Sequence, residues 1–151
     1  MRRRQTMNLG LALAAATLAA APAWADSDQT YDVDNLVANP AAFPRATAIH
    51  AIIRKTEQGL LLHQNACGWT CSSPVYLTLP AKPAAIPGGK RFAACLDKAW
   101  AAGADFDGYV KVRIAWGGTP RKMTGFVLVA AIQGGIVSRT DPSQATDCPT
   151  G

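Results

Sequence analysis

The N-terminal segment sets the redox conditions in which the rest of the chain folds, and this constrains the cysteines that follow. Three arginines, Arg2 to Arg4, precede an apolar run from Leu9 to Ala21 and a small-x-small end at Ala23-Trp24-Ala25. This pattern is typical of a secretory signal peptide over residues 1–25, cleaved after Ala25. We therefore expect a periplasmic or secreted protein, in a compartment where cysteines pair as disulfides.

Loss of this segment lowers the net charge. Without the three leader arginines, twelve of the fifteen basic residues remain against ten acids, which changes the net charge from +5 to +2. Nucleic-acid binding usually shows as a strongly basic domain, so we expect no nucleic-acid partner. Every other apolar run is shorter than the ~18 residues that a membrane span needs, so we expect no membrane insertion after signal removal.

The four cysteines are Cys67, Cys71, Cys95 and Cys148, and they allow three disulfide connectivities. A local Cys67–Cys71 bridge requires a bent loop, because four extended residues span ~13 Å and a disulfide needs Cα atoms within ~7 Å. The alternatives join this loop to the segment around Cys95 or to the C-terminal tail.

Two other interpretations of Cys67 and Cys71 compete with a structural disulfide. A thiol-disulfide site normally has a Cys-x-x-Cys motif at a helix N-terminus, whereas here Pro74 and a strand-like run follow. A metal site is conceivable because His63, Cys67 and Cys71 are evenly spaced, but thiolate zinc sites favour other spacings.

Hydrophobic periodicity predicts a mainly β chain with one long helix. A short helix over 32–39 has Asp32 as its N-cap and stops at Pro40. Alternation predicts strands over 46–56, 60–64, 75–79 and 109–115, with Ile49, Ala51, Ile53, Val110, Val112 and Ile114 pointing inward. A last strand over 124–132 is apolar on both faces, so we expect it to be buried on both sides or covered by the N-terminal segment.

One segment between the third and fourth strands changes to a helical period. Apolar residues recur at helical spacing and form one stripe, which consists of Phe92, Cys95, Leu96, Ala99 and Trp100. Gly103 then ends the helix. We expect residues 81–89 to form a loop, and Asp105 and Asp107 to lie in a glycine-flanked turn. The chain then divides into one domain over 26–133 and an irregular tail over 134–151, tethered by Cys148.

The order of three strands, a helix and two strands resembles the OB-fold, a five-stranded Greek-key barrel. The opening "DVDNLVANPAAFPRATAIHAIIRK" also looks like the start of exported OB-like domains, except that Arg45 stands where such domains often have glycine. The resemblance covers residues 32–133 and implies that all four cysteines share one pole of the barrel, with the final strand descending toward it. A small β-sandwich is the alternative architecture.

The OB-fold resemblance also implies a binding face, flanked by the loops over 54–59 and 116–122. Outward candidates on this face are Tyr76, Arg113, Trp116, Arg121 and Lys122. The simpler alternative is that the cations solvate a hairpin while Trp116 closes the barrel. We expect His50 and His63 to be surface or partly buried residues, because no orienting carboxylate motif accompanies them.

These observations favour a non-enzymatic binding or accessory domain with no cofactor, because the sequence lacks the common hydrolase, zinc-protease and phosphate-loop motifs. We also expect the protein to be a monomer. The expected ligand is a small anionic or sugar molecule, or a protein partner. The alternative is a thiol-disulfide or metal-handling protein centred on Cys67 and Cys71.

Overall fold

A computed structural model describes residues 29–148, and the predicted signal peptide lies outside the described residues. The described chain begins with strand β1 (Tyr31–Asp32) and helix α1 (Val33–Ala38). Asp32 is the N-cap, as predicted. Its carboxylate accepts a hydrogen bond from the Asn35 backbone N–H, and its own N–H donates to the Asn35 side chain. The α-helix ends before Pro40, which opens the 3-10 turn η1 (Pro40–Ala42).

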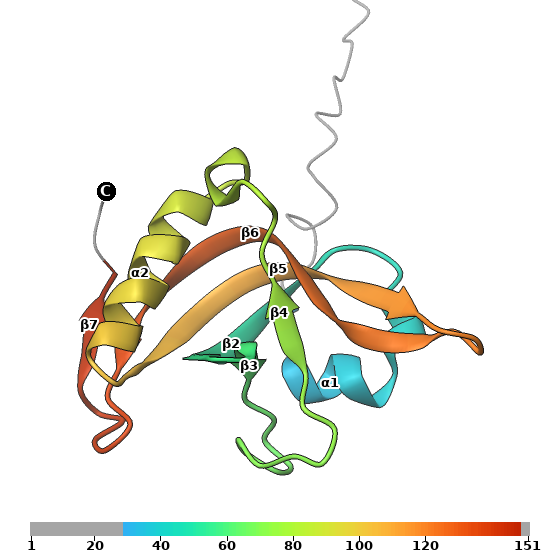
Figure 1. Cartoon of the computed structure of the whole chain (residues 1–151), viewed down its shortest axis with the longest axis horizontal. Coiled ribbons are helices and arrows are strands. Elements are labelled where there is room, and N and C mark those ends of the chain that lie inside the picture. The colour runs from blue at the N-terminus through green and yellow to red at the C-terminus, as the bar shows by residue number, and fades with distance from the viewer. Residues whose placement is uncertain (1–28, 149–151) are drawn as a thin grey trace, which may run out of the picture.

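Five strands form a closed ring of pairings, seen in Figure 1. They are β2 (Thr47–Thr56), β3 (Gly59–Leu62), β4 (Tyr76–Thr78), β5 (Asp105–Gly117) and β6 (Lys122–Val137). Around the ring the order is β2, β3, β4, β6, β5, and β5 pairs again with β2. β4 and β6 run parallel, and the other neighbours in the ring are antiparallel.

Two short strands extend this sheet. β1 pairs with β2, and β7 (Ala145–Asp147) pairs with β6. All the described strands belong to one sheet, rather than to the two separate sheets of a sandwich. The predicted mainly β class with one main helix is therefore confirmed.

The core lies inside the ring and under the helices. Ile49, Ala51 and Ile53 of β2 are buried, as the alternation predicts. The same is true of the inward residues of β5, which are Val110, Val112 and Ile114. Leu36 of α1 is fully buried in the same cluster, so the short N-terminal helix packs its apolar side onto the core.

Helix α2 (Gly89–Ala101) follows the loop that contains the 3-10 turn η2 (Pro83–Ala85). Four of the five stripe residues are buried: Phe92, Cys95, Leu96 and Ala99. The fifth prediction is wrong, because Trp100 is 47% exposed. It lies about 80° around the helix from Phe92, at the edge of the stripe, where the helix no longer faces the sheet. Gly103 has a left-handed φ of 61° just after the helix, as expected of its C-terminal role.

The beginning of β5 corrects another expectation. Asp105 and Asp107 lie on the strand and not in a turn, because Phe106 and Asp107 already pair with Ile53 and Ile52 of β2. The Asp105 carboxylate is buried, and it accepts hydrogen bonds from Arg54 and Arg139 at 2.9–3.0 Å. A carboxylate that is paired with arginines in this way can be buried within a strand. Periodicity alone does not reveal such a pairing.

Strand β6 differs in length and burial from the predicted last strand. Its inward residues Phe126 and Leu128 are buried, whereas Ile132 is 49% exposed, so the strand is not buried on both faces. β6 also continues to Val137, and β7 lies within the segment predicted to be irregular. The expected tether is present, since Cys148 is bonded to Cys95.

The disulfides pair Cys67 with Cys71 and Cys95 with Cys148. The first is the local bridge, and its Cα atoms are 5.1 Å apart because the loop bends through Gly68, whose φ is 67°. The predicted common pole is wrong. Figure 1 shows α2 and the loop between β3 and β4 on opposite sides of the ring. The prediction assumed that the last strand runs opposite to the third one. In the structure β6 runs parallel to β4.

No helix within residues 29–148 is both long and apolar enough to cross a lipid bilayer.

Candidate functional site

The hairpin between β5 and β6 carries three of the predicted binding residues. Trp116 is half-buried against the core, while Arg121 and Lys122 are exposed. The guanidinium carbon of Arg121 lies 4.7 Å from the centre of the Trp116 ring. Neither Arg121 nor Lys122 forms an ion pair with any described residue. The hairpin therefore presents an aromatic ring with two uncompensated cations.

The two other predicted residues lie apart from this stack. Arg113 is exposed on β5 opposite Val127 of β6, and it adds a third cation on the same pair of strands. Burial lowers the pKa of the neighbouring Lys111. Tyr76 is half-buried on β4 and lies beside Gly59, next to the turn between β2 and β3. The structure therefore joins Trp116 with Arg121 and places Tyr76 near the other flanking loop.

The loop that contains Cys67 and Cys71 is fastened to the rest of the fold. The carboxylate of Asp34 on α1 accepts hydrogen bonds from the backbone N–H groups of Asn65 and Ala66, at 2.7 and 2.9 Å. Trp69 packs edge-on against His63, with ring centroids 4.9 Å apart. Its ring also lies under the guanidinium of Arg54, 4.0 Å from the ring centre. Trp69 therefore acts as an anchor of this loop.

His50 is exposed and His63 is half-buried, as predicted, but His50 has a carboxylate partner that no sequence motif indicated. Its Nε2 lies 2.5 Å from Oδ1 of Asp107, and its ring centroid lies 5.3 Å from that of Tyr109. Asp107 is 57 residues away in sequence, and only the pairing of β2 with β5 brings it beside His50. The outward alternation of Asp107 and Tyr109 on β5 was the available sequence signal, but it did not identify their partner.

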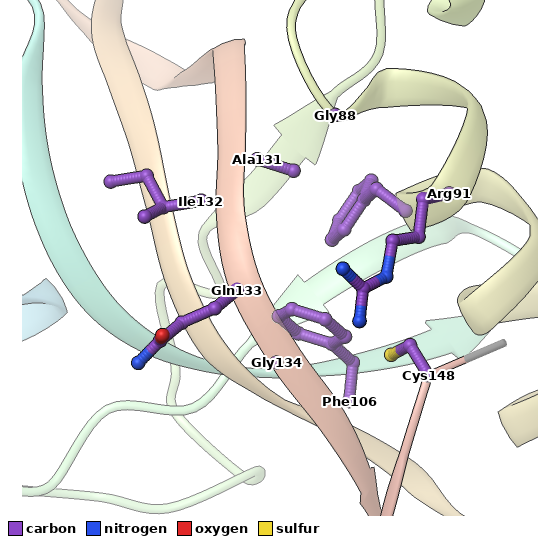
Figure 2. A pocket seen from close by; sticks show the side chains of 9 residues that line it. Gly88, Arg91, Phe106, Ala131, Ile132, Gln133, Gly134 and Cys148 are labelled. Atoms are coloured by element: carbon purple, nitrogen blue, oxygen red, sulfur yellow. The ribbon is translucent and has the colours of Figure 1, made fainter. Parts of the chain in front are cut away.

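An open groove of about 740 Å³ crosses the outer side of β5, β6 and β7. Its lining includes His50, Asp107, Tyr109, Gln133, Arg91 and Asp147. A smaller cavity of about 70 Å³ adjoins it between α2 and β6, and the two share Arg91, Ile132, Gln133 and Gly134. In Figure 2, Ile132 and Gln133 point away from the helix, whereas Arg91 reaches from α2 toward Phe106 and Cys148. None of the lining residues of this groove was predicted as a binding residue.

Metal coordination has little support among residues 29–148, where no three His, Cys, Asp or Glu side chains form a cluster able to hold a metal ion. Cys67 and Cys71 are bonded to each other, so neither supplies the thiolate that a zinc site requires.

Comparison with known proteins gives no relative: no protein-family model, curated protein or solved structure matches the chain. The chemistry of its surfaces is therefore the basis for a functional proposal.

Proposed function

We propose that this protein is an exported OB-type domain that binds an anionic ligand or an acidic partner segment through the β5–β6 hairpin. The OB assignment is supported by the ring, in which the fourth strand (β5) returns across a helical connection to lie beside the first (β2). Such a return is the defining connection of a Greek key. In OB-folds the loop between the fourth and fifth strands flanks the ligand, and here that loop is the Trp116–Lys122 hairpin.

The observation that carries the proposal is the stack of Arg121 on Trp116, 4.7 Å from the ring centre. Stacking on an indole holds the guanidinium in a defined orientation, with its N–H groups available to a carboxylate or sulfate. Arg113 and Lys122 contribute positive charge on the same strands without a described acidic partner. Periplasmic or secreted location agrees with the two disulfides, which persist in oxidising compartments.

Binding to heparin and to polygalacturonate, two anionic polysaccharides of different charge type, tests this function. We expect Arg121→Ala combined with Lys122→Ala to weaken binding by at least about tenfold at low salt, because two cations are lost. The matched control is Lys90→Ala combined with Lys98→Ala, which removes the same charge from exposed positions on α2. Equal weakening by both pairs would indicate a non-specific charge effect and contradict the proposal.

A second candidate function, thiol-disulfide exchange at Cys67 and Cys71, is favoured by one observation. Cys67 is exposed, whereas Cys95 and Cys148 of the other disulfide are buried. Exchange requires access of an attacking thiolate to a sulfur, which the first bridge provides.

Equilibration of the protein with glutathione buffers, followed by alkylation and peptide mapping, tests this candidate. A redox-active bridge is expected to open within the range of thiol oxidoreductases, roughly −270 to −120 mV. A potential below about −300 mV is typical of a structural disulfide and would exclude this role. The Cys95–Cys148 bridge serves as the internal reference in the same samples.

A further inference from the structure

A row of side chains crosses three strands of the sheet on its outer side. His50 of β2 is the register partner of Tyr109 of β5, and Tyr109 is in turn the partner of Gln133 of β6. Register partners on adjacent strands project from the same face, so these three side chains are neighbours. The row spans two interstrand spacings, or ~10 Å. It forms part of the lining of the 740 Å³ groove.

The groove also contains exposed apolar side chains. Only three large hydrophobic side chains are exposed within residues 29–148: Trp100, Tyr109 and Ile132. Tyr109 and Ile132 both line this groove, and their exposed fractions are 38% and 49%. An exposed tyrosine offers a flat apolar ring face together with a polar hydroxyl. Such a surface can cover the C–H face of a ligand ring while the hydroxyl stays in water.

The polar lining contains donors and acceptors in similar measure. Arg91 donates, Asp107 and Asp147 accept, and the Gln133 amide does both. Arg91 is the only Lys or Arg side chain in the lining, against the two carboxylates of Asp107 and Asp147, so the lining does not favour an anionic ligand. The hydrogen bond from His50 to Asp107 fixes both side chains in the groove. Such a mixture of donors and acceptors suits hydroxyl groups, since each hydroxyl both donates and accepts.

From this juxtaposition of an exposed aromatic ring with paired donors and acceptors, we infer that the groove over β5, β6 and β7 binds a neutral saccharide. The Tyr109 ring stacks on a sugar ring, and the His50–Asp107 pair and Gln133 hydrogen-bond its hydroxyls. This site is separate from the hairpin proposed above to bind anions, and it does not depend on that function.

The test is calorimetric titration of the protein with a panel of neutral di- and trisaccharides built from glucose, galactose, mannose and N-acetylglucosamine. We expect at least one member to bind. Tyr109→Ala should then weaken its binding by at least about tenfold, since the stacking surface is lost. Tyr109→Phe, which retains the ring face, should change the affinity by less than about threefold. Trp100→Ala removes an exposed aromatic outside the groove and should have no effect.

Three outcomes would overturn the inference: no member of the panel binds at millimolar concentration, Tyr109→Ala binds as tightly as the parent protein, or only the acidic counterparts of these sugars bind. Far-UV circular dichroism of each variant shows whether it is folded, and Gln133→Ala provides a second groove variant if Tyr109→Ala does not fold. The Arg121→Ala, Lys122→Ala variant should retain saccharide binding, so failure at one site is distinguishable from failure at the other.

Discussion

Arg54 lies over the ring of Trp69, with its guanidinium carbon 4.0 Å from the ring centre. The same guanidinium donates two hydrogen bonds, each 2.9 Å long, to the carboxylate of Asp105. One side chain of β2 therefore connects the cysteine loop with the beginning of β5. Because Asp105 also accepts from Arg139, the contact extends to the segment after β6.

We expect Trp69→Ala to lower the free energy of unfolding by ~1–2 kcal/mol, because the stack on Arg54 and the edge contact with His63 are both lost. Urea unfolding gives this free energy directly. The control is Trp100→Ala, because Trp100 is 47% exposed and the Lys55 ammonium over it lies as far as 6.0 Å from the ring centre. If the two variants lose the same stability, Trp69 does not anchor the loop.

Asp105→Asn should destabilise the protein by ~1–3 kcal/mol, because a buried carboxylate that accepts from two arginines is replaced by a neutral amide. The matched control is Asp97→Asn. Asp97 pairs with Lys55 on the surface at 2.9 Å, and exposed pairs contribute ~0–1 kcal/mol. Thermal and urea unfolding of both variants compare a buried with an exposed ion pair; a loss at Asp97 as large as that at Asp105 would contradict the assignment.

Gly88 and Gly103 provide a pair of substitutions that separates steric contact from backbone strain. Both have a left-handed φ, 69° and 61°. A Cβ atom on Gly88 would lie 2.1 Å from the Ala131 carbonyl oxygen, whereas one on Gly103 would meet no atom within 4 Å. Gly103→Ala should cost ~1 kcal/mol of stability from strain alone, and Gly88→Ala clearly more. Similar unfolding midpoints for the two variants would mean that α2 is not held close to β6 through Gly88.

Features governed by local periodicity were predicted from the sequence. The alternation at Ile49, Ala51 and Ile53 placed β2 and its buried face correctly, and the spacing from Phe92 to Ala99 placed α2. The cap at Asp32 was equally local. These signals depend on residues within one or two turns of each other, so no knowledge of the tertiary fold is needed to interpret them.

Features governed by distant pairing were not predicted. The burial of Asp105 depends on arginines 51 and 34 residues away, and the contact of His50 with Asp107 depends on the register of β2 with β5. The candidate surfaces divide in the same way. Trp116 and Arg121 are close in sequence and were identified as candidates, whereas the row of His50, Tyr109 and Gln133 becomes visible only when three strands are aligned.

The closed ring also bears on assembly, because several of its contacts join segments that are far apart in the sequence. The β2–β3 hairpin and the Cys67–Cys71 bridge involve only the first half of the chain and can form early. β4 has no second neighbour until β6 arrives, and Cys95 waits for a partner 53 residues later. Until then, one side of β4 and the thiol of Cys95 are open to other molecules. The pairing of β4 with β6 and the Cys95–Cys148 bridge are therefore the contacts that depend most on the C-terminal part of the chain.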